Sequence, residues 1–315
     1  LINLIEFLAA HNMQAFGTPS IFPVYSLSGS RDSFRYRIMP YSGGSDQVIF
    51  NDGLIGVPFA FFLVWPDRYY HTSGDQPERC DPTQLKRSSL LAAAATIFLS
   101  DDCPHQARRL AGEMAARSRI RLTEELKRGF NLLNWSETKD LALNYKEALN
   151  FIDQAIKREV ASLESLKNYS RRDKEIDQFL SIYIDKLKKE KASWLSELDQ
   201  FYRLTCQARG IKPERISLTP EEMAASKIIP KRHPELKGPV NLAYLREKIK
   251  DQTEAFNLPI FQEDSRITYE ILNFVNGQNS LLDIRQAVSA EFKPIPLSWI
   301  QAYLELLARA RIVIF

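Results

Sequence analysis

The chain has 315 residues, of which 44% are hydrophobic and 26% are charged. This length predicts two or three domains and excludes a single small module, and the composition is that of a folded globular protein. The net charge of +3 is too small to indicate a nucleic-acid or membrane partner. The chain also contains no run of about 18 apolar residues, which is the length that a helix needs to span a bilayer. The cysteines Cys80, Cys103 and Cys206 are widely separated, so we expect reduced thiols, which favour the cytoplasm. A signal peptide, if the protein has one, would precede Leu1.

The first predicted region, residues 1–103, combines helices with strands. Leu1–Ala10 has apolar residues at helical spacing, and Ser33–Met39 predicts a strand. Val57–Trp65 is short, continuous, apolar and rich in Val and Phe, which is typical of a strand buried on both faces. Asp81–Pro82 predicts the start of a further helix. A buried strand with helices to cover it predicts an α/β fold.

The second predicted region, residues 104–210, consists of long, charged helices. A helix over His105–Leu133 is followed by two amphipathic helices that begin near Ser136 and Ser170, the last of which ends near Gly210. Two such helices joined by a short turn predict an antiparallel hairpin, because each must bury its apolar stripe. The hairpin could therefore serve as the interface of a homodimer.

The third and fourth predicted regions are a connector, residues 211–262, and a small module, residues 263–315. Six prolines interrupt the connector, in which Thr219–Glu222 predicts the start of a short helix. Three helices and a terminal strand predict a winged-helix-like fold for the last region. Its six acidic and five basic residues give a net charge of −1, which does not favour DNA binding.

The candidate chemistry lies between Tyr41 and Asp81. Gly43 and Gly44 predict a tight loop before Ser45 and Asp46, and His71 and Asp75 follow the predicted strand at a spacing of four. Loops at strand ends commonly form ligand sites, and a neutral imidazole is a good zinc ligand whose other nitrogen a carboxylate can hold. On spacing alone, a histidine hydrogen-bonded within a turn is the favoured alternative.

The order of these features resembles the C-terminal part of the catalytic domain in metallopeptidase family twenty-eight. That family includes zinc aminopeptidases, glutamate carboxypeptidases, glutaminyl cyclases and an inactive receptor ectodomain. The resemblance covers about Leu1–Leu99 and rests on Gly-Gly-Ser-Asp, Gly-Val-Pro before an apolar run, and His-Thr-x-x-Asp. It implies that residues 1–103 are part of a three-layer αβα zinc-peptidase domain, followed by the all-α helical hairpin and the winged-helix-like module.

The resemblance also implies roles for individual residues. His71 corresponds to the family's last metal ligand, and Asp75 to the acid that follows it. Ser45 and Asp46 correspond to the loop that contacts substrate or the outer shell of the site. Gln47 stands where the family usually has His, and glutamine cannot take up a proton, which puts substrate handling in doubt.

By this resemblance, the chain is the C-terminal portion of a zinc-dependent aminopeptidase-like hydrolase that acts on peptide N-termini through metal-activated water. One or two zinc ions would bind with further ligands, and the general base would lie upstream of Leu1, because a single imidazole cannot support the reaction. The alternative is a non-catalytic interaction or scaffold protein that retains the peptidase fold, and Gln47 and the missing ligands favour it.

Overall fold

A computed structural model describes residues 1–13, 24–39, 43–100, 104–169, 173–240, 242–249 and 257–315. These residues form two compact units. Unit 1 comprises Leu1–Pro40, Pro58–Ile120 and Glu159–Lys186, and unit 2 comprises Tyr41–Val57, Arg121–Arg158 and Leu187–Phe315.

The described elements are mostly helices, which make up 64% of the chain. The α-helices are α1 (Ile2–Met13), α2 (Gln47–Phe50), α3 (Pro82–Ser100), α4 (Pro104–Asn134), α5 (Leu141–Tyr169), α6 (Lys174–Ala208), α7 (Pro220–Ala225), α8 (Leu242–Lys248), α9 (Ser265–Asn273), α10 (Leu281–Glu291) and α11 (Leu297–Arg309). Short 3₁₀ helices span Pro77–Arg79, Thr138–Asp140 and Pro259–Gln262, and two strands, β1 (Lys231–Arg232) and β2 (Val313–Ile314), form an antiparallel pair. None of the helices in these described ranges is both long enough and apolar enough to cross a membrane.

The expected α/β fold is wrong. The described residues are mainly α-helical, and they contain no three-layer αβα domain. Val57–Trp65 runs without a strand partner and is largely exposed, Val64 by 79% and Trp65 by 67%. Ser33–Met39 likewise forms no strand. An extended segment becomes a β-strand only when another strand pairs with a run of its N–H and C=O groups, and neither segment forms such a ladder with the described residues.

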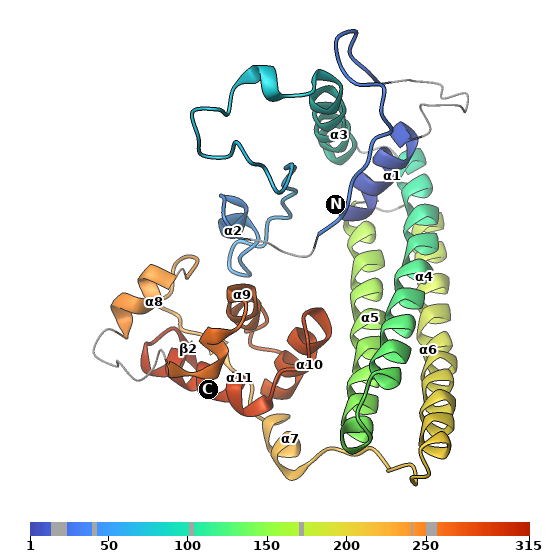
Figure 1. Cartoon of the computed structure of the whole chain (residues 1–315), viewed down its shortest axis with the longest axis vertical. Helices are drawn as coiled ribbons and strands as arrows, with labels where there is room; N and C mark the ends of the chain where they lie inside the picture. Colours follow the sequence, from blue (N-terminus) through green and yellow to red (C-terminus); the bar gives the residue numbers. More distant parts are fainter. Residues whose placement is uncertain (14–23, 40–42, 101–103, 170–172, 241, 250–256) are drawn as a thin grey trace. The chain divides into compact units, whose positions relative to one another are not determined.

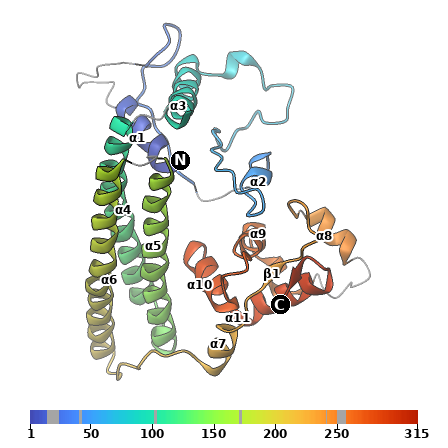
Figure 2. The ribbon, with the colours of Figure 1, turned by 180° about the vertical axis from the view of Figure 1, so that it is seen from behind.

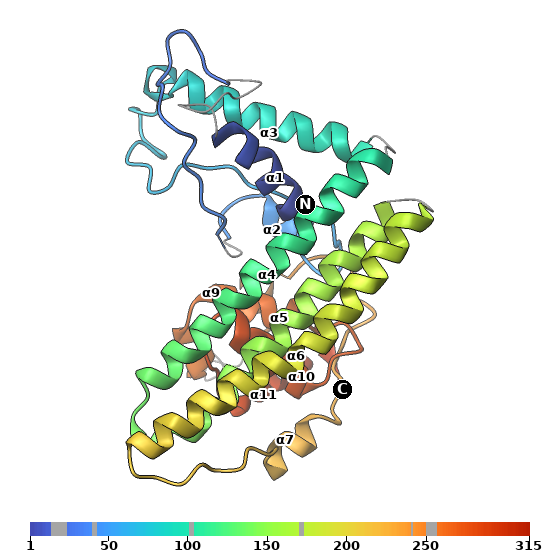
Figure 3. The same ribbon diagram turned by 90° about the vertical axis from the view of Figure 1, so that its right-hand side faces the viewer.

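In unit 1, α1 lies alongside α3 (Figure 3), and Ala9 packs with Leu91 in a small apolar cluster. The predicted helix start at Asp81 is confirmed, since its Oδ1 accepts a hydrogen bond from the Thr83 amide at 2.8 Å. Arg87 of α3 is buried, and its guanidinium donates to the main-chain carbonyls of Asp32 at 2.7 Å and Val24 at 3.0 Å, in the irregular segment that precedes α3. Because a buried charge must be hydrogen-bonded, Arg87 holds that irregular segment against α3.

The helices α4, α5 and α6 lie side by side in both units (Figures 1 and 2). The three helices predicted between His105 and Gly210 are thus confirmed, and the expected two-helix hairpin is extended by α4. In unit 2 the rings of Tyr145 and Tyr202 stack at 4.1 Å. In unit 1 the Tyr183 hydroxyl donates to a carbonyl of α4 at 2.5 Å. Apolar stripes at helical spacing therefore bury against each other, as the sequence indicates.

In unit 2, the described residues from Pro220 to Phe315 share one apolar core, and we call them the C-terminal module. The predicted helices of the last region and its terminal strand are confirmed as α9, α10, α11 and β2. The strand partner β1 and the core residues Leu245 and Ile260 come from the predicted proline-rich connector. The connector is therefore part of the packed module.

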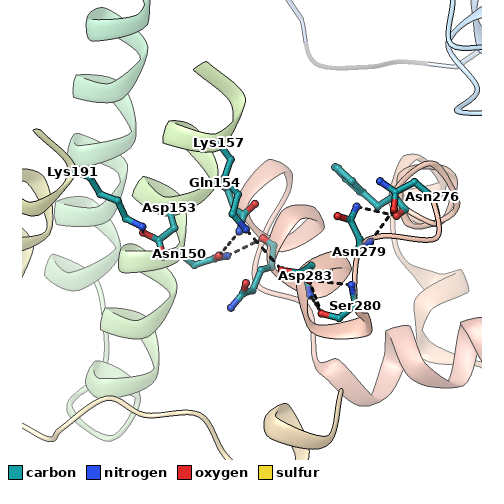
Figure 4. Close-up of polar contacts among 11 residues, drawn as sticks. Asn150, Asp153, Gln154, Lys157, Lys191, Asn276, Asn279, Ser280 and Asp283 are labelled. Carbon is teal, nitrogen blue, oxygen red and sulfur yellow. Dashed lines mark hydrogen bonds and ion pairs between the residues drawn. The ribbon is translucent and has the colours of Figure 1, made fainter. Parts of the chain in front are cut away.

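Polar contacts attach the C-terminal module to α5 within unit 2. Arg285 forms an ion pair with Glu147, whose side chain is 1% exposed. Asn150 donates to the Gln286 carbonyl at 2.9 Å, close to the capping box in which Ser280 begins α10 (Figure 4). Since these groups are buried or half-buried, their pairing fixes the docking of α10 on α5.

Candidate functional site

The candidate ligand His71 lies on a hydrogen-bonded turn of unit 1. Its backbone is in the left-handed region, with φ of 58°. The amide and the hydroxyl of Thr72 both donate to the Tyr69 carbonyl, at 3.0 Å and 2.7 Å, and so close the turn around His71. Non-glycine residues seldom adopt this conformation, which costs about 1–2 kcal/mol and often marks functional positions.

The imidazole of His71 is exposed and stacks on the Tyr70 ring at 3.8 Å, with 19° between the planes. Tyr70 in turn meets Trp65 edge to face at 5.7 Å. Within the described residues neither imidazole nitrogen takes part in a hydrogen bond or an ion pair. A neutral imidazole binds a metal ion through one of its two nitrogens, and the other then carries the proton.

The carboxylate of Asp75 is exposed on the same loop. The Asp75 amide donates to the Thr72 carbonyl at 3.2 Å, which continues the series of turns after His71. No interaction engages its carboxylate in the part of the chain that the structure describes. The loop thus presents an imidazole and a carboxylate, two of the ligand types that zinc prefers.

The other candidate residues, Ser45, Asp46 and Gln47, belong to unit 2. Gly44, with φ of 106°, turns the chain before them, and Ser45 and Asp46 are exposed at the start of α2. Gln47 is buried, with 4% of its surface exposed. The side chain of Gln47 is therefore packed in unit 2, whereas Ser45 and Asp46 remain open to a ligand.

A buried polar cluster holds the segment that carries these residues. Asp52, which is 1% exposed, accepts from Arg232 of β1 at 3.2 Å and from the Leu54 amide at 2.9 Å. The side-chain oxygen of Asn273 on α9 accepts from the Gly53 amide at 2.9 Å and from Arg232 at 3.3 Å. We call Asp52, Arg232 and Asn273 the anchoring cluster. The sequence analysis missed it, because the dipeptide Asp52–Gly53 indicates a turn but nothing local indicates its distant partners.

Two carboxyl groups beside this cluster have raised pKa values. Burial, with Glu291 and Asp52 nearby, raises the pKa of Glu270 to about 7. Burial also raises the pKa of Glu291, against the opposing effect of the cations Arg158 and Arg266. These α9 and α10 side chains therefore favour their neutral forms more than exposed glutamates do.

An apolar depression of about 340 Å³ lies elsewhere in unit 2, and its lining includes Trp135, Phe151 and Phe292. Arg128 at its edge lies 3.9 Å from the centre of the Phe151 ring and donates to the Phe292 carbonyl at 3.1 Å. Lys293 forms an ion pair with Glu263, in which Nζ and the carboxylate oxygen are 2.6 Å apart. Both cations are thus engaged within the fold, so the depression offers mainly apolar surface.

Within the described residues, no three His, Cys, Asp or Glu side chains gather as a metal-binding group. No family model, no curated protein and no solved structure matches the chain. The resemblance to metallopeptidase family twenty-eight therefore stays a prediction from the sequence.

Proposed function

We propose that the chain forms the C-terminal portion of a zinc-dependent aminopeptidase-like hydrolase, to which it contributes the metal ligand His71. The observation that carries the proposal is the exposed imidazole of His71, free at both nitrogens in the described structure and fixed on a turn with a left-handed backbone. Backbone strain at an exposed histidine suits a ligand whose orientation matters.

The residue types fit such a site. The His71 imidazole would hold zinc through one nitrogen, and Asp75 on the same loop could orient the ring through the other. In unit 2, Ser45 and Asp46 present a hydroxyl and a carboxylate, and a carboxylate is suited to bind a peptide's free ammonium group. Bound zinc would polarise the peptide carbonyl and lower the pKa of a water molecule. The other zinc ligands and the general base would come from residues outside the described part of this chain.

The test compares His71→Ala and His71→Gly in the protein expressed from its natural gene. Glycine adopts the left-handed backbone without strain, so His71→Gly removes the imidazole and preserves the turn. We expect both variants to lower zinc affinity by at least about 10- to 100-fold, the loss that follows even from removing an outer-shell partner. Hydrolysis of aminoacyl anilides should fall in parallel, whereas the control His105→Ala should retain zinc and activity.

Equal zinc content and equal hydrolysis in the wild type and His71→Gly would refute the metal role. Loss in His71→Ala alone would refute it as well, because the effect would then come from the backbone and not from the imidazole.

One observation favours the alternative of a non-catalytic interaction protein. The apolar run Val57–Trp65 is exposed, with Leu63 at 52% and Trp65 at 67%, and contiguous exposed apolar surface commonly marks an interaction site. Under this alternative the wild-type protein would bind no zinc and hydrolyse no aminoacyl anilide. Replacing Leu63 and Trp65 by Ser would then abolish binding of the partner protein, whereas His71→Gly would leave that binding unchanged.

A further inference from the structure

We propose that Arg232, Tyr269 and Asn273 of the C-terminal module are positioning residues for the segment Gly43–Val57, and so for the exposed side chains Ser45 and Asp46. The functional part of this inference rests on the proposed hydrolase, whereas the positioning itself does not.

The first attachment is a buried ion pair between residues 180 positions apart. Asp52 and Arg232 have side chains that are 2% and 8% exposed, and their charged atoms are 3.2 Å apart. The same oxygen of Asp52 accepts the Leu54 amide at 2.9 Å, which shapes the turn after Asp52. The ion pair and the turn therefore depend on one atom, so that loss of Arg232 would leave a buried carboxylate and a weakened turn.

The second attachment joins Gly53 to α9. The Gly53 amide donates to the Asn273 side chain at 2.9 Å, and a Cβ at position 53 would lie 3.2 Å from the Asn273 carbonyl oxygen. Such a close approach of two backbones is natural for glycine and would force a neighbour to move for other residues. Asn273 also accepts from Arg232, so it links the two attachments.

The third attachment lies one helical turn earlier on α9. The Tyr269 hydroxyl donates to the Val48 carbonyl at 2.7 Å, within α2. Tyr269 and Asn273 are four residues apart, so they lie on the same face of α9. Gln47, which immediately precedes Val48, is buried. Exposed Ser45 and Asp46 therefore immediately precede a stretch that is held at residues 48, 52 and 53.

A segment held at three points by one module cannot shift independently of that module. Loss of an attachment should free Gly43–Val57 locally, because the other contacts of the C-terminal module, such as Arg285 with Glu147, do not involve the segment. Substrate that contacts Ser45 or Asp46 would then bind less well, while residues elsewhere would be unaffected.

The test uses hydrogen–deuterium exchange of the full chain, followed in peptides that cover residues 43–57. Tyr269→Phe removes one hydroxyl and keeps the ring, and Arg232→Met removes the buried cation. We expect Tyr269→Phe to speed exchange in the segment by about three- to tenfold, the effect of one lost hydrogen bond, and Arg232→Met to speed it more. The matched control Tyr145→Phe removes a similar hydroxyl in unit 2, one that donates to Asp199, and should leave the segment's exchange unchanged.

Unchanged exchange of residues 43–57 in Tyr269→Phe and Arg232→Met would overturn the proposal, as would equal acceleration in Tyr145→Phe. If Arg232→Met fails to fold, Tyr269→Phe decides, because it deletes a single polar atom. Aminoacyl-anilide hydrolysis supplies the second measurement, in which Tyr269→Phe should raise KM more than it lowers kcat. A wild-type protein without hydrolysis would refute the proposed function and leave the exchange result to decide the positioning.

Discussion

The pH dependence of stability should reveal the half-buried carboxyl group of Glu270. Burial raises its pKa from the ordinary value of 4.5 to about 7, and the neighbouring carboxyl groups of Glu291 and Asp52 act in the same direction. The Asn273 amide, which donates to Glu270 at 3.4 Å, acts in the opposite direction. Replacement by glutamine keeps the shape and the hydrogen-bond acceptor but removes the ionisation.

The magnitude follows from the two pKa values. The interval from 4.5 to about 7, at about 1.4 kcal/mol for each pKa unit, corresponds to about 3 kcal/mol. The folded protein binds this proton more tightly than the unfolded chain does, so the stabilisation is fully present below pH 4.5 and is lost as the pH rises through about 7. Glu270→Gln keeps its neutral side chain at every pH. At pH 8 it should therefore be more stable than the wild type by up to about 3 kcal/mol, and at pH 4 the two should be equal within roughly 0.5 kcal/mol.

Urea denaturation between pH 4 and pH 9, followed by tryptophan fluorescence and circular dichroism, measures this difference. The control Glu305→Gln replaces an exposed carboxyl of α11 that accepts from Gln301 at 2.9 Å, and it should not show the same rise with pH. A constant difference between Glu270→Gln and the wild type across this range would refute the reasoning, because a group that titrates must change its contribution near its pKa.

Two further predictions concern packing and pairing in unit 2. Arg285→Met should lower the free energy of unfolding by about 3–5 kcal/mol, since it leaves the carboxylate of Glu147 buried without its cation. Adding Glu147→Leu to this variant should restore most of the loss. If denaturation shows the double variant to be no more stable than Arg285→Met, this reasoning is contradicted. Gly129→Val should lower the melting temperature, because a Cβ at this position would lie 2.9 Å from a methyl group of Leu198. A Cβ at Gly112 would have no other atom within 4 Å, so Gly112→Ala should raise the free energy of unfolding by up to about 1 kcal/mol. Equal melting temperatures for the two glycine variants would show that α4 and α6 are not closely packed.

Much of the helical structure could be predicted from the sequence, because helices are specified by local patterns. The caps illustrate this: Asp81 begins α3, and Thr219 with Glu222 forms the capping box of α7. In α5, residues such as Leu141 and Ile152 recur on one buried stripe, so their spacing predicts both the helix and its inward face.

The strands could not be predicted in the same way. The composition of Val57–Trp65 indicates burial, but composition does not say which strand would pair with it, and it forms no strand pair with the described residues. The strand pair that does form, β1 with β2, joins Arg232 to Val313, and β1 lies in a stretch whose prolines indicate a connector. Pairing between distant segments depends on the tertiary fold, which a local pattern does not contain.

The same distinction separates the candidate residues of unit 1 from those of unit 2. The loop with His71 and Asp75 is held by contacts within a few residues, so its chemistry is visible in the sequence. The segment with Ser45 and Asp46 is held instead by side chains some 180 to 220 residues away, and no spacing rule connects them. If those exposed groups bind a ligand, its affinity depends on β1 and α9 as much as on the glycine-rich loop itself. The C-terminal module would then act on the ligand through the position that it gives to the segment.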